Sequence, residues 1–289
     1  MTDAPEPAGL SRPDSAAGKL QRILLRLLRE HERDGALPTN GRFLFYELVG
    51  LKVVSKEKKQ GRGRRNDQDM HDALTHLRDK GIVPWDWIVD ETRSLDDYTG
   101  SSSIRDGAVA MVRHMRLCPG RGRAPLILTE SRSLSGVLRD LADEYAVRIS
   151  ATNGQTAGHL HTVVAPALER GDRVLYIGDF DWCGGQIESN TRNVLERLVG
   201  DGLEWTRIAL TEEQVEGYRL EDKQIMKPDH RYSPVRYHPA VETEALKQQV
   251  IVQIIRDALD TELPEPLPHV LERERRQRAQ VARLLRRRR

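Results

Sequence analysis

The chain has very little cysteine and no long apolar run. Its 289 residues include only two cysteines, Cys118 and Cys183, which excludes a disulfide framework and fits reduced thiols in a cytoplasm. Because no stretch of about 18 consecutive apolar residues occurs, we expect no membrane-spanning helix. The first residues also lack the basic-then-apolar plan of a secretory signal, so we expect residues 1–18 to form a disordered leader. These absences predict a cytoplasmic protein without a membrane partner.

Net charge is also low, but the charges are placed unevenly. Residues 271–289 hold nine arginines and two glutamates, a charge of +7 that leaves about −5 for the rest of a chain whose total is +2. A second basic cluster, residues 55–65, contains six cations and one acid. Such blocks are typical of contact with polyanions, although a basic run can also be a solvated face or a solubility device. We expect nucleic-acid contact at the internal cluster and leave the role of the tail open.

Helical patterns dominate the first part of the chain. Apolar residues recur at helical spacing over residues 20–32, and shorter helices are expected over residues 41–50 and 68–81. Residues 82–93 alternate apolar and polar side chains, which predicts one or two short strands. The candidate N-caps of the second and third helices are Thr39 or Asn40 and Asn66 or Asp67. Periodicity alone predicts a small helical domain, and the order of its elements resembles a winged helix-turn-helix.

The second half alternates strands with helices. Strands are expected in the apolar runs "APLILTE", "AVRIS", "RVLYIGDFD" and "EWTRIAL", with helical patterns between them and after residue 240. Alternation of this kind predicts an α/β fold with a mostly parallel sheet and helices on both of its faces. Open sheets of this class place their ligands at the carboxyl ends of the strands.

Three carboxylates follow two of these strands. Glu130 ends one strand, and Asp179 and Asp181 end another, on the same side of an extended backbone. At about 4 Å two like charges repel by about 4 kcal/mol at an effective dielectric of about 20, so a shared proton or a cation is expected. Oxygen ligands of this kind suit Mg²⁺. In the alternative interpretation, Asp179 caps the following turn and Asp181 the following helix.

The run "YIGDFDWCGGQIE", with Glu130 ahead of it, resembles the Toprim domain of type IIB topoisomerase A subunits and of the related meiotic break-forming proteins. That family has a glutamate after its first strand and then a DxD with a glycine three residues beyond it, which correspond here to Glu130, Asp179, Asp181 and Gly184. The resemblance implies that the three acids bind Mg²⁺. The chain departs from the family at Trp182, where a proline is usual, and in the turn at residues 153–155.

A further acidic motif, "ETEAL", follows the strands. Its Glu242 and Glu244 match a motif found near a helix start in bacterial and phage Toprim proteins. They can add a carboxylate to the metal site, or can cap the helix and interact favourably with its dipole. Lys227 and Arg231 are candidate phosphate contacts or ordinary surface residues.

The resemblance extends to the N-terminal half. The family carries an arginine and, after three intervening residues, its catalytic tyrosine on a winged helix, and "RFLFY" places Arg42 and Tyr46 at that spacing. A phenol with a pKa of about 10 is a poor nucleophile at neutral pH and benefits from a nearby cation. The resemblance implies that Tyr46 attacks a phosphodiester and forms a 5′-phosphotyrosyl link. Tyr46 can instead be a packing residue of an amphipathic helix.

The expected organisation is therefore a leader (residues 1–18), a winged-helix-like DNA-binding domain (19–115), a Toprim domain with a Rossmann-like, mostly parallel sheet (120–262) and a basic tail (263–289). The resemblance implies a Mg²⁺-dependent protein that binds and cleaves double-stranded DNA, works as a homodimer in the nucleoid and needs a separate ATPase subunit. The alternatives are a Toprim nuclease that activates water, and a DNA-binding accessory without catalysis.

Overall fold

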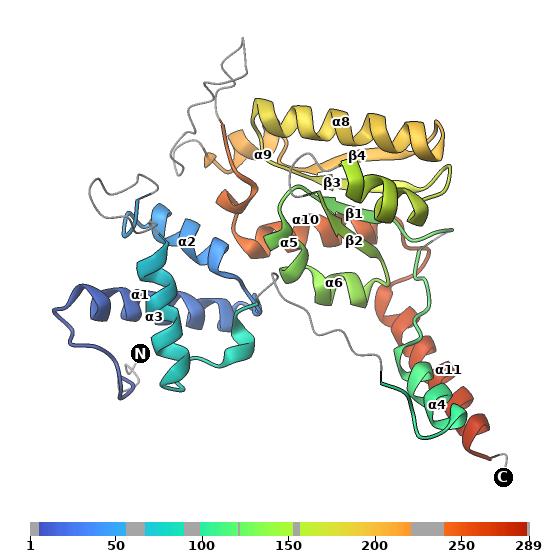
Figure 1. Ribbon diagram of the computed structural model, residues 1–289, viewed down its shortest axis with the longest axis horizontal. Helices are drawn as coiled ribbons and strands as arrows, with labels where there is room; N and C mark the ends of the chain where they lie inside the picture. The colour runs from blue at the N-terminus through green and yellow to red at the C-terminus, as the bar shows by residue number, and fades with distance from the viewer. Residues whose placement is uncertain are drawn as a thin grey trace.

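The computed structural model describes residues 6–55, 67–89, 99–120, 122–152, 157–220 and 240–287. Figure 1 shows a group of helices, α1 to α3, beside a layer of strands and helices, with a pair of helices extending toward the C-terminus. Among the described residues, no helix has both the length and the apolar character that crossing a lipid bilayer requires.

The described elements include the three N-terminal helices and the four strands expected from the sequence, and also helices that were not expected at residues 104–114 and 267–287. The N-terminal helices are α1 (Ala16–Arg33), α2 (Gly41–Gly50), α3 (Gln68–Asp79), the 3₁₀ turn η1 (Trp85–Trp87) and α4 (Ile104–His114). The strands are β1 (Leu126–Thr129), β2 (Arg148–Ala151), β3 (Arg173–Ile177) and β4 (Glu204–Ala209). The other helical elements are α5 (Arg132–Val137), α6 (Arg139–Glu144), α7 (Ala157–His159), η2 (Leu160–Val164), η3 (Ala165–Ala167), α8 (Trp182–Val199), α9 (Glu212–Gly217), η5 (Thr243–Ala245), α10 (Gln248–Asp260) and α11 (Leu267–Arg287).

The three N-terminal helices form around one apolar cluster. Leucines on one face of α1 pack against Leu44 and Leu48 of α2 and against Met70 and Leu77 of α3. Asn40 caps α2, because its side-chain oxygen accepts hydrogen bonds from the first backbone N–H groups of the helix. Helix α1 begins at Ala16 and so includes the last residues of the segment that we expected to be a leader.

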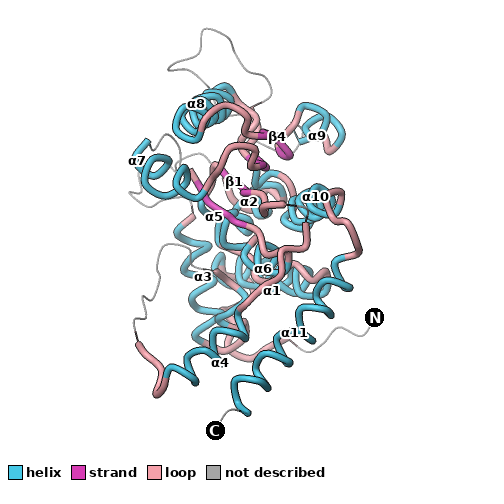
Figure 2. Tube along the Cα trace, turned by 90° about the vertical axis from the view of Figure 1, so that its right-hand side faces the viewer, coloured by secondary structure: helices cyan, strands magenta, loops and turns pink. Residues whose placement is uncertain are grey.

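Within the described residues, the strands form one all-parallel sheet of four in the order β2-β1-β3-β4, which confirms the α/β prediction. Alternate strand residues serve the two faces of the sheet, as the pleat requires. Ile127 and Ile177 pack on the α10 side, whereas Leu128 and Tyr176 pack on the side of α8 and η2. Figure 2 shows α8 and α10 on opposite sides of the strands.

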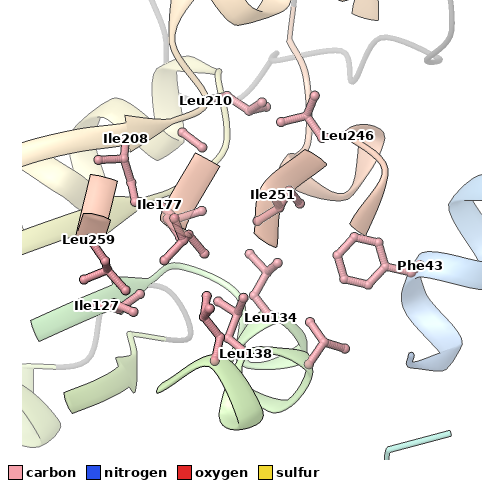
Figure 3. Close-up of a cluster of buried hydrophobic side chains, with 14 of the residues drawn as sticks. Phe43, Ile127, Leu134, Leu138, Ile177, Ile208, Leu210, Leu246, Ile251 and Leu259 are labelled. Atoms are coloured by element: carbon pink, nitrogen blue, oxygen red, sulfur yellow. The ribbon is translucent and has the colours of Figure 1, made fainter. Parts of the chain in front are cut away.

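Phe43 of α2 joins the helical part to the sheet part. Leu44 and Leu48 of α2 belong to the N-terminal cluster, but the Phe43 ring is 1% exposed and belongs to the core beneath the sheet. Figure 3 shows the ring pointing from α2 toward Leu134 and Ile251. Polar bonds reinforce this contact, because Gln248 of α10 donates to the carbonyls of Ala36 and Pro38 at 2.9 Å.

Some expectations about local structure are wrong. Residues 85–87, expected to lie in a strand, form the 3₁₀ turn η1, because the extended conformation of Pro84 leads directly into a tight turn. Instead of the single helix that the pattern predicts around residues 161–170, the chain forms a short α, π and 3₁₀ succession from Ala157 to Ala167. The basic tail contains helix α11, which lies beside α4, as Figures 1 and 2 both show.

Candidate functional site

Two of the predicted acids meet at the carboxyl edge of the sheet. β1 and β3 are parallel neighbours, so Glu130 and Asp179, which follow them, emerge on the same edge. The Asp179 backbone N–H donates to Oε2 of Glu130 at 3.1 Å. The Glu130 backbone N–H in turn donates to the carbonyl of Ile177 at 2.8 Å, which extends the ladder to the glutamate itself. The two strand ends are thus connected through the glutamate side chain.

A segment from far along the chain returns to the same edge. Phe180 and Val241 form an antiparallel bridge with hydrogen bonds of 2.8 and 2.9 Å. Next to this bridge, Oδ1 of Asp179 accepts from the backbone N–H of Thr243 at 2.9 Å and from its hydroxyl at 3.1 Å. Asp179 therefore fixes the start of η5 and holds the "ETEAL" segment against the strand end, with its own side chain buried.

Asp181 is the N-cap of α8. Its Oδ1 accepts from the backbone N–H of Gly184 at 2.6 Å. The capping role given above as the alternative for Asp181 is therefore present in the structure. The glycine is required here, because a Cβ on Gly184 would lie 2.4 Å from the carbonyl oxygen of Asp179. This close approach gives a physical reason for a glycine at that distance from the aspartates.

Glu242 and Glu244 form ion pairs with Arg42, the arginine identified in the sequence analysis. Nε of Arg42 lies 2.8 Å from Oε1 of Glu244, and its Nη2 lies 3.7 Å from Oε2 of Glu242. The Ser133 hydroxyl also donates to Glu244 at 2.8 Å. Burial raises the pKa of Glu242 to about 7, opposed by the Arg42 charge and assisted by the neighbouring Glu244 carboxylate. The acidic pair thus links the sheet part to α2 across their contact.

Tyr46 lies one turn beyond Arg42 and is half-buried. Its ring makes an edge-to-face contact with Phe45, with centroids 5.8 Å apart, and the Arg42 guanidinium carbon lies 5.8 Å from its centroid. Tyr46 also lines a cavity of about 540 Å³ between the two parts, together with Glu244 and Lys247. The ring therefore borders this cavity, and whether Tyr46 acts as a nucleophile or as a packing residue stays a prediction.

The donor chemistry at the sheet edge fits a hard divalent cation. Glu130 and Asp179 supply carboxylate oxygens at neighbouring strand ends, and Asp181 follows two residues later. The described ranges contain no group of three or more His, Cys, Asp or Glu side chains already placed around one point as a metal would require. The Glu130 carboxylate contacts the Asp179 backbone rather than its carboxylate, and the Asp181 side chain caps the N-terminus of α8.

No family model, curated protein or solved structure matches this chain.

The structure adds residues that the sequence did not single out. Thr243 connects the Asp179 carboxylate to the acidic pair, and the Ser133 hydroxyl donates to Glu244. Asn40, which the sequence indicated only as a helix cap, also donates through its side-chain amide to the Ser133 carbonyl at 2.8 Å. Their signal in sequence is weak, because a lone threonine between two glutamates also fits an exposed turn. The turn at residues 153–155, Lys227, Arg231 and nearly all of the internal basic cluster lie outside the described residues.

Proposed function

We propose that this chain is a Mg²⁺-dependent protein that binds and cleaves double-stranded DNA, with a winged-helix-like N-terminal part and a Toprim-like α/β part. The observation that carries the proposal is the contact between Glu130 and Asp179 at the ends of neighbouring parallel strands. Carboxylates gathered at this edge of a parallel sheet are suited to a cation that in turn engages phosphate oxygens.

Glu130, Asp179 and Asp181 would hold the cation. When bound, Mg²⁺ would neutralise charge on the phosphate and on the leaving oxygen. Asp179 is held in place by the amide and hydroxyl of Thr243, so its carboxylate needs little reorganisation before it binds a ligand. This fixed geometry is what a preformed site requires.

Tyr46 is the proposed nucleophile. Its phenol oxygen would form a bond to phosphorus, the bond from phosphorus to the 3′ oxygen of deoxyribose would break, and the phenol proton would end on that oxygen. The Arg42 guanidinium carbon lies 5.8 Å from the centroid of the ring, and Arg42 would stabilise charge on the bound phosphate. In the related family one protomer's tyrosine works with another's metal site, so the proposal includes a homodimer and a separate ATPase subunit.

A second candidate function is hydrolysis by activated water. It is favoured by one observation: the Arg42 guanidinium is ion-paired with the fully buried Glu244 side chain rather than directed at the phenol oxygen. In this case Tyr46 would shape the cavity, and the same three carboxylates would hold the metal.

A covalent-adduct assay distinguishes these functions. Labelled duplex DNA is incubated with the full chain and Mg²⁺, denatured, and resolved with and without protease treatment. Tyrosine attack predicts label that stays with protein until proteolysis and is lost in Tyr46→Phe. The matched control is Tyr218→Phe, because Tyr218 is an exposed tyrosine that lines the same cavity and should leave the adduct unchanged.

The other outcomes are equally specific. Free ends that form equally well in Tyr46→Phe would identify a nuclease, and salt-sensitive binding without cutting under any divalent ion would identify a DNA-binding accessory.

Metal binding is tested separately by calorimetry without DNA. Glu130→Gln and Asp179→Asn are expected to weaken Mg²⁺ binding by at least about tenfold, a loss of about 1.4 kcal/mol. Glu212→Gln, at an exposed acid in the first turn of α9, is the control. Equal Mg²⁺ affinities in all three variants would remove the basis of the enzymatic proposal.

A further inference from the structure

Helices α4 and α11, called the helical arm from here on, extend together from the rest of the molecule, as Figures 1 and 2 show. Glu274 of α11 is 2% exposed; it accepts from the backbone N–H of Leu117 at 2.7 Å and pairs with Nε of Arg116 at 3.1 Å, just after α4. One turn later, Arg278 donates to the carbonyl of Arg113 at 2.6 Å. These bonds all lie on one side of α11, so they also fix the direction of its opposite side.

The opposite side of α11 carries a row of exposed arginines. This arginine row consists of Arg275, Arg276, Arg283 and Arg286. Spacings of three, seven and eleven residues relate these positions, and each spacing returns to nearly the same side of an α-helix. At a rise of about 1.5 Å per residue, the row is about 16 Å long. The helix therefore presents its guanidinium groups as an ordered line rather than as a cluster.

Little negative charge opposes the arginine row. Glu272 is the one acid of α11 on that side, and it pairs with the first two arginines of the row at 2.8 and 3.0 Å. Residues 279–289 contain five arginines and no acid. Within the part of the chain that the structure describes, Arg283 and Arg286 have no acidic partner. At least two of the four charges are therefore available to an external anion.

The positive charge of the molecule is concentrated at this arm. Residues 271–289 carry +7, and the total of +2 leaves about −5 for the remaining chain. Guanidinium groups donate in pairs to phosphate oxygens, and each strand of duplex DNA carries a phosphate about every 3.4 Å along the axis. A row about 16 Å long can therefore meet several phosphates of one strand. A polymer of phosphates matches this surface in both charge and length.

An anionic lipid surface matches the row less well. The exposed apolar residues of α11, Val281 and Leu284, lie on a different side of the helix from the arginine row. Insertion of these two residues into a membrane would turn the row away from the lipid headgroups. Contact between the row and a nucleic-acid backbone leaves both of them undisturbed.

We propose that the arginine row of the helical arm binds the phosphate backbone of double-stranded nucleic acid without reading its sequence. The inference rests on the DNA binding included in the proposed function and assigns part of that binding to the arm. It requires neither Mg²⁺ nor Tyr46, because contacts to phosphates position a duplex and carry no base information.

The test measures the affinity of the full chain for a labelled duplex by fluorescence anisotropy over a range of KCl concentrations, without divalent ions. Each phosphate contact contributes about 0.9 to the slope of log affinity against log salt concentration. The double variant Arg283→Gln/Arg286→Gln should therefore lower the magnitude of the slope by about 1.8 and weaken binding at least about fivefold at about 0.1 M salt. Two duplexes of equal length and unrelated sequence should give the same slope.

A matched variant on α8 separates the arm from charge in general. Arg192→Gln/Arg197→Gln removes the same charge from two exposed residues of the sheet part and should leave the slope unchanged. Far-UV circular dichroism checks that both double variants keep their helices. An equal loss of slope in the two double variants would overturn the inference, because it would show that only net charge matters.

The remaining outcomes distinguish this inference from the proposed function. Duplex binding with an unchanged slope in the arm variant would overturn the inference and leave the proposed function in place, whereas a wild-type chain that binds no duplex would overturn both. The same proteins are tested by flotation with vesicles of equal parts phosphatidylcholine and phosphatidylserine. Loss of flotation in the arm variant alone, with its DNA slope unchanged, would assign the row to a lipid surface and overturn the inference.

Discussion

Asp179 and Glu242 are both buried carboxylates beside the same edge of the sheet, but different donors surround them. Asp179 is 8% exposed and accepts two hydrogen bonds from Thr243, one from a backbone amide and one from a hydroxyl. Glu242 is 5% exposed, and its ion pair with Arg42 spans 3.7 Å. Burial raises the pKa of Glu242 to about 7.

The difference shows two ways to keep an acid inside a protein. Hydrogen bonds from fixed donors hold the direction of a carboxylate, which suits a ligand for a cation. A guanidinium on another element, such as that of Arg42 on α2, holds a carboxylate in place only while α2 stays in contact with the sheet part of the molecule. We therefore expect Asp179 to behave as a rigid element of the sheet edge, and Glu242 and Glu244 to report on the contact with α2.

The largest effect is expected from Asp179→Ala. The change leaves the amide and hydroxyl of Thr243, which is 1% exposed, without an acceptor. Each unsatisfied buried donor costs about 1–3 kcal/mol, so the free energy of unfolding should fall by about 3 kcal/mol in denaturant titration. Asp179→Asn keeps a carbonyl oxygen in the same place and should cost less than about 1 kcal/mol. Equal losses in both variants would show that the charge, not the acceptor geometry, stabilises the segment.

A smaller effect is expected from Arg42→Met. The variant removes the cation that faces Glu244, whose side chain is 0% exposed, but Arg42 itself is 42% exposed and partly screened by solvent. We expect a loss of about 2 kcal/mol in the free energy of unfolding. In a double-mutant cycle with Glu244→Gln, the two changes should couple by about 1 kcal/mol. Strict additivity would mean that the ion pair contributes nothing to holding α2 on the sheet part.

A pH dependence of stability is also expected, and Glu242→Gln should remove it. Because the folded pKa of about 7 lies above the ordinary value of 4.5, the folded state keeps the proton that the unfolded chain has released. Stability should therefore fall as pH rises from 4.5 to 7 and level off above it. One pKa unit corresponds to about 1.4 kcal/mol, so the total is at most about 3 kcal/mol.

This dependence is measured as the difference in unfolding free energy between the two proteins from pH 4 to pH 8, without divalent ions. Glu242→Gln should be the more stable protein at the alkaline end. A constant difference across the range would contradict the raised pKa of Glu242.

Much of the fold could be predicted from local patterns. Helical spacing and the Asn40 cap place α1 and α2 correctly, and the apolar runs place all four described strands, because each pattern depends on neighbouring residues alone. The turn at Trp85 and the helix of the basic tail were missed. In both segments the composition did not distinguish one type of secondary structure from another. The conformation depends on what the segment packs against; α11, for example, lies along α4.

The candidate site could also be predicted from the sequence only in part. Glu130 and Asp179 could be placed at one edge from the sequence, since parallel strands end on the same side and the Asp-x-Asp spacing is short. The acids that pair with Arg42 could not be predicted from the sequence. Glu242 and Glu244 come from a segment far along the chain, which returns to the sheet through the bridge between Phe180 and Val241.

The amino-acid sequence by itself determined the helices α1 to α3, the four described strands, the Asn40 cap and which acids follow which strand, because these depend on periodicity and on close neighbours in the chain. Only the tertiary structure decided which distant donor an acid meets: Thr243 for Asp179 and Arg42 for Glu244. The physical reason is that a buried carboxylate takes whatever donors the packing of other elements brings near it.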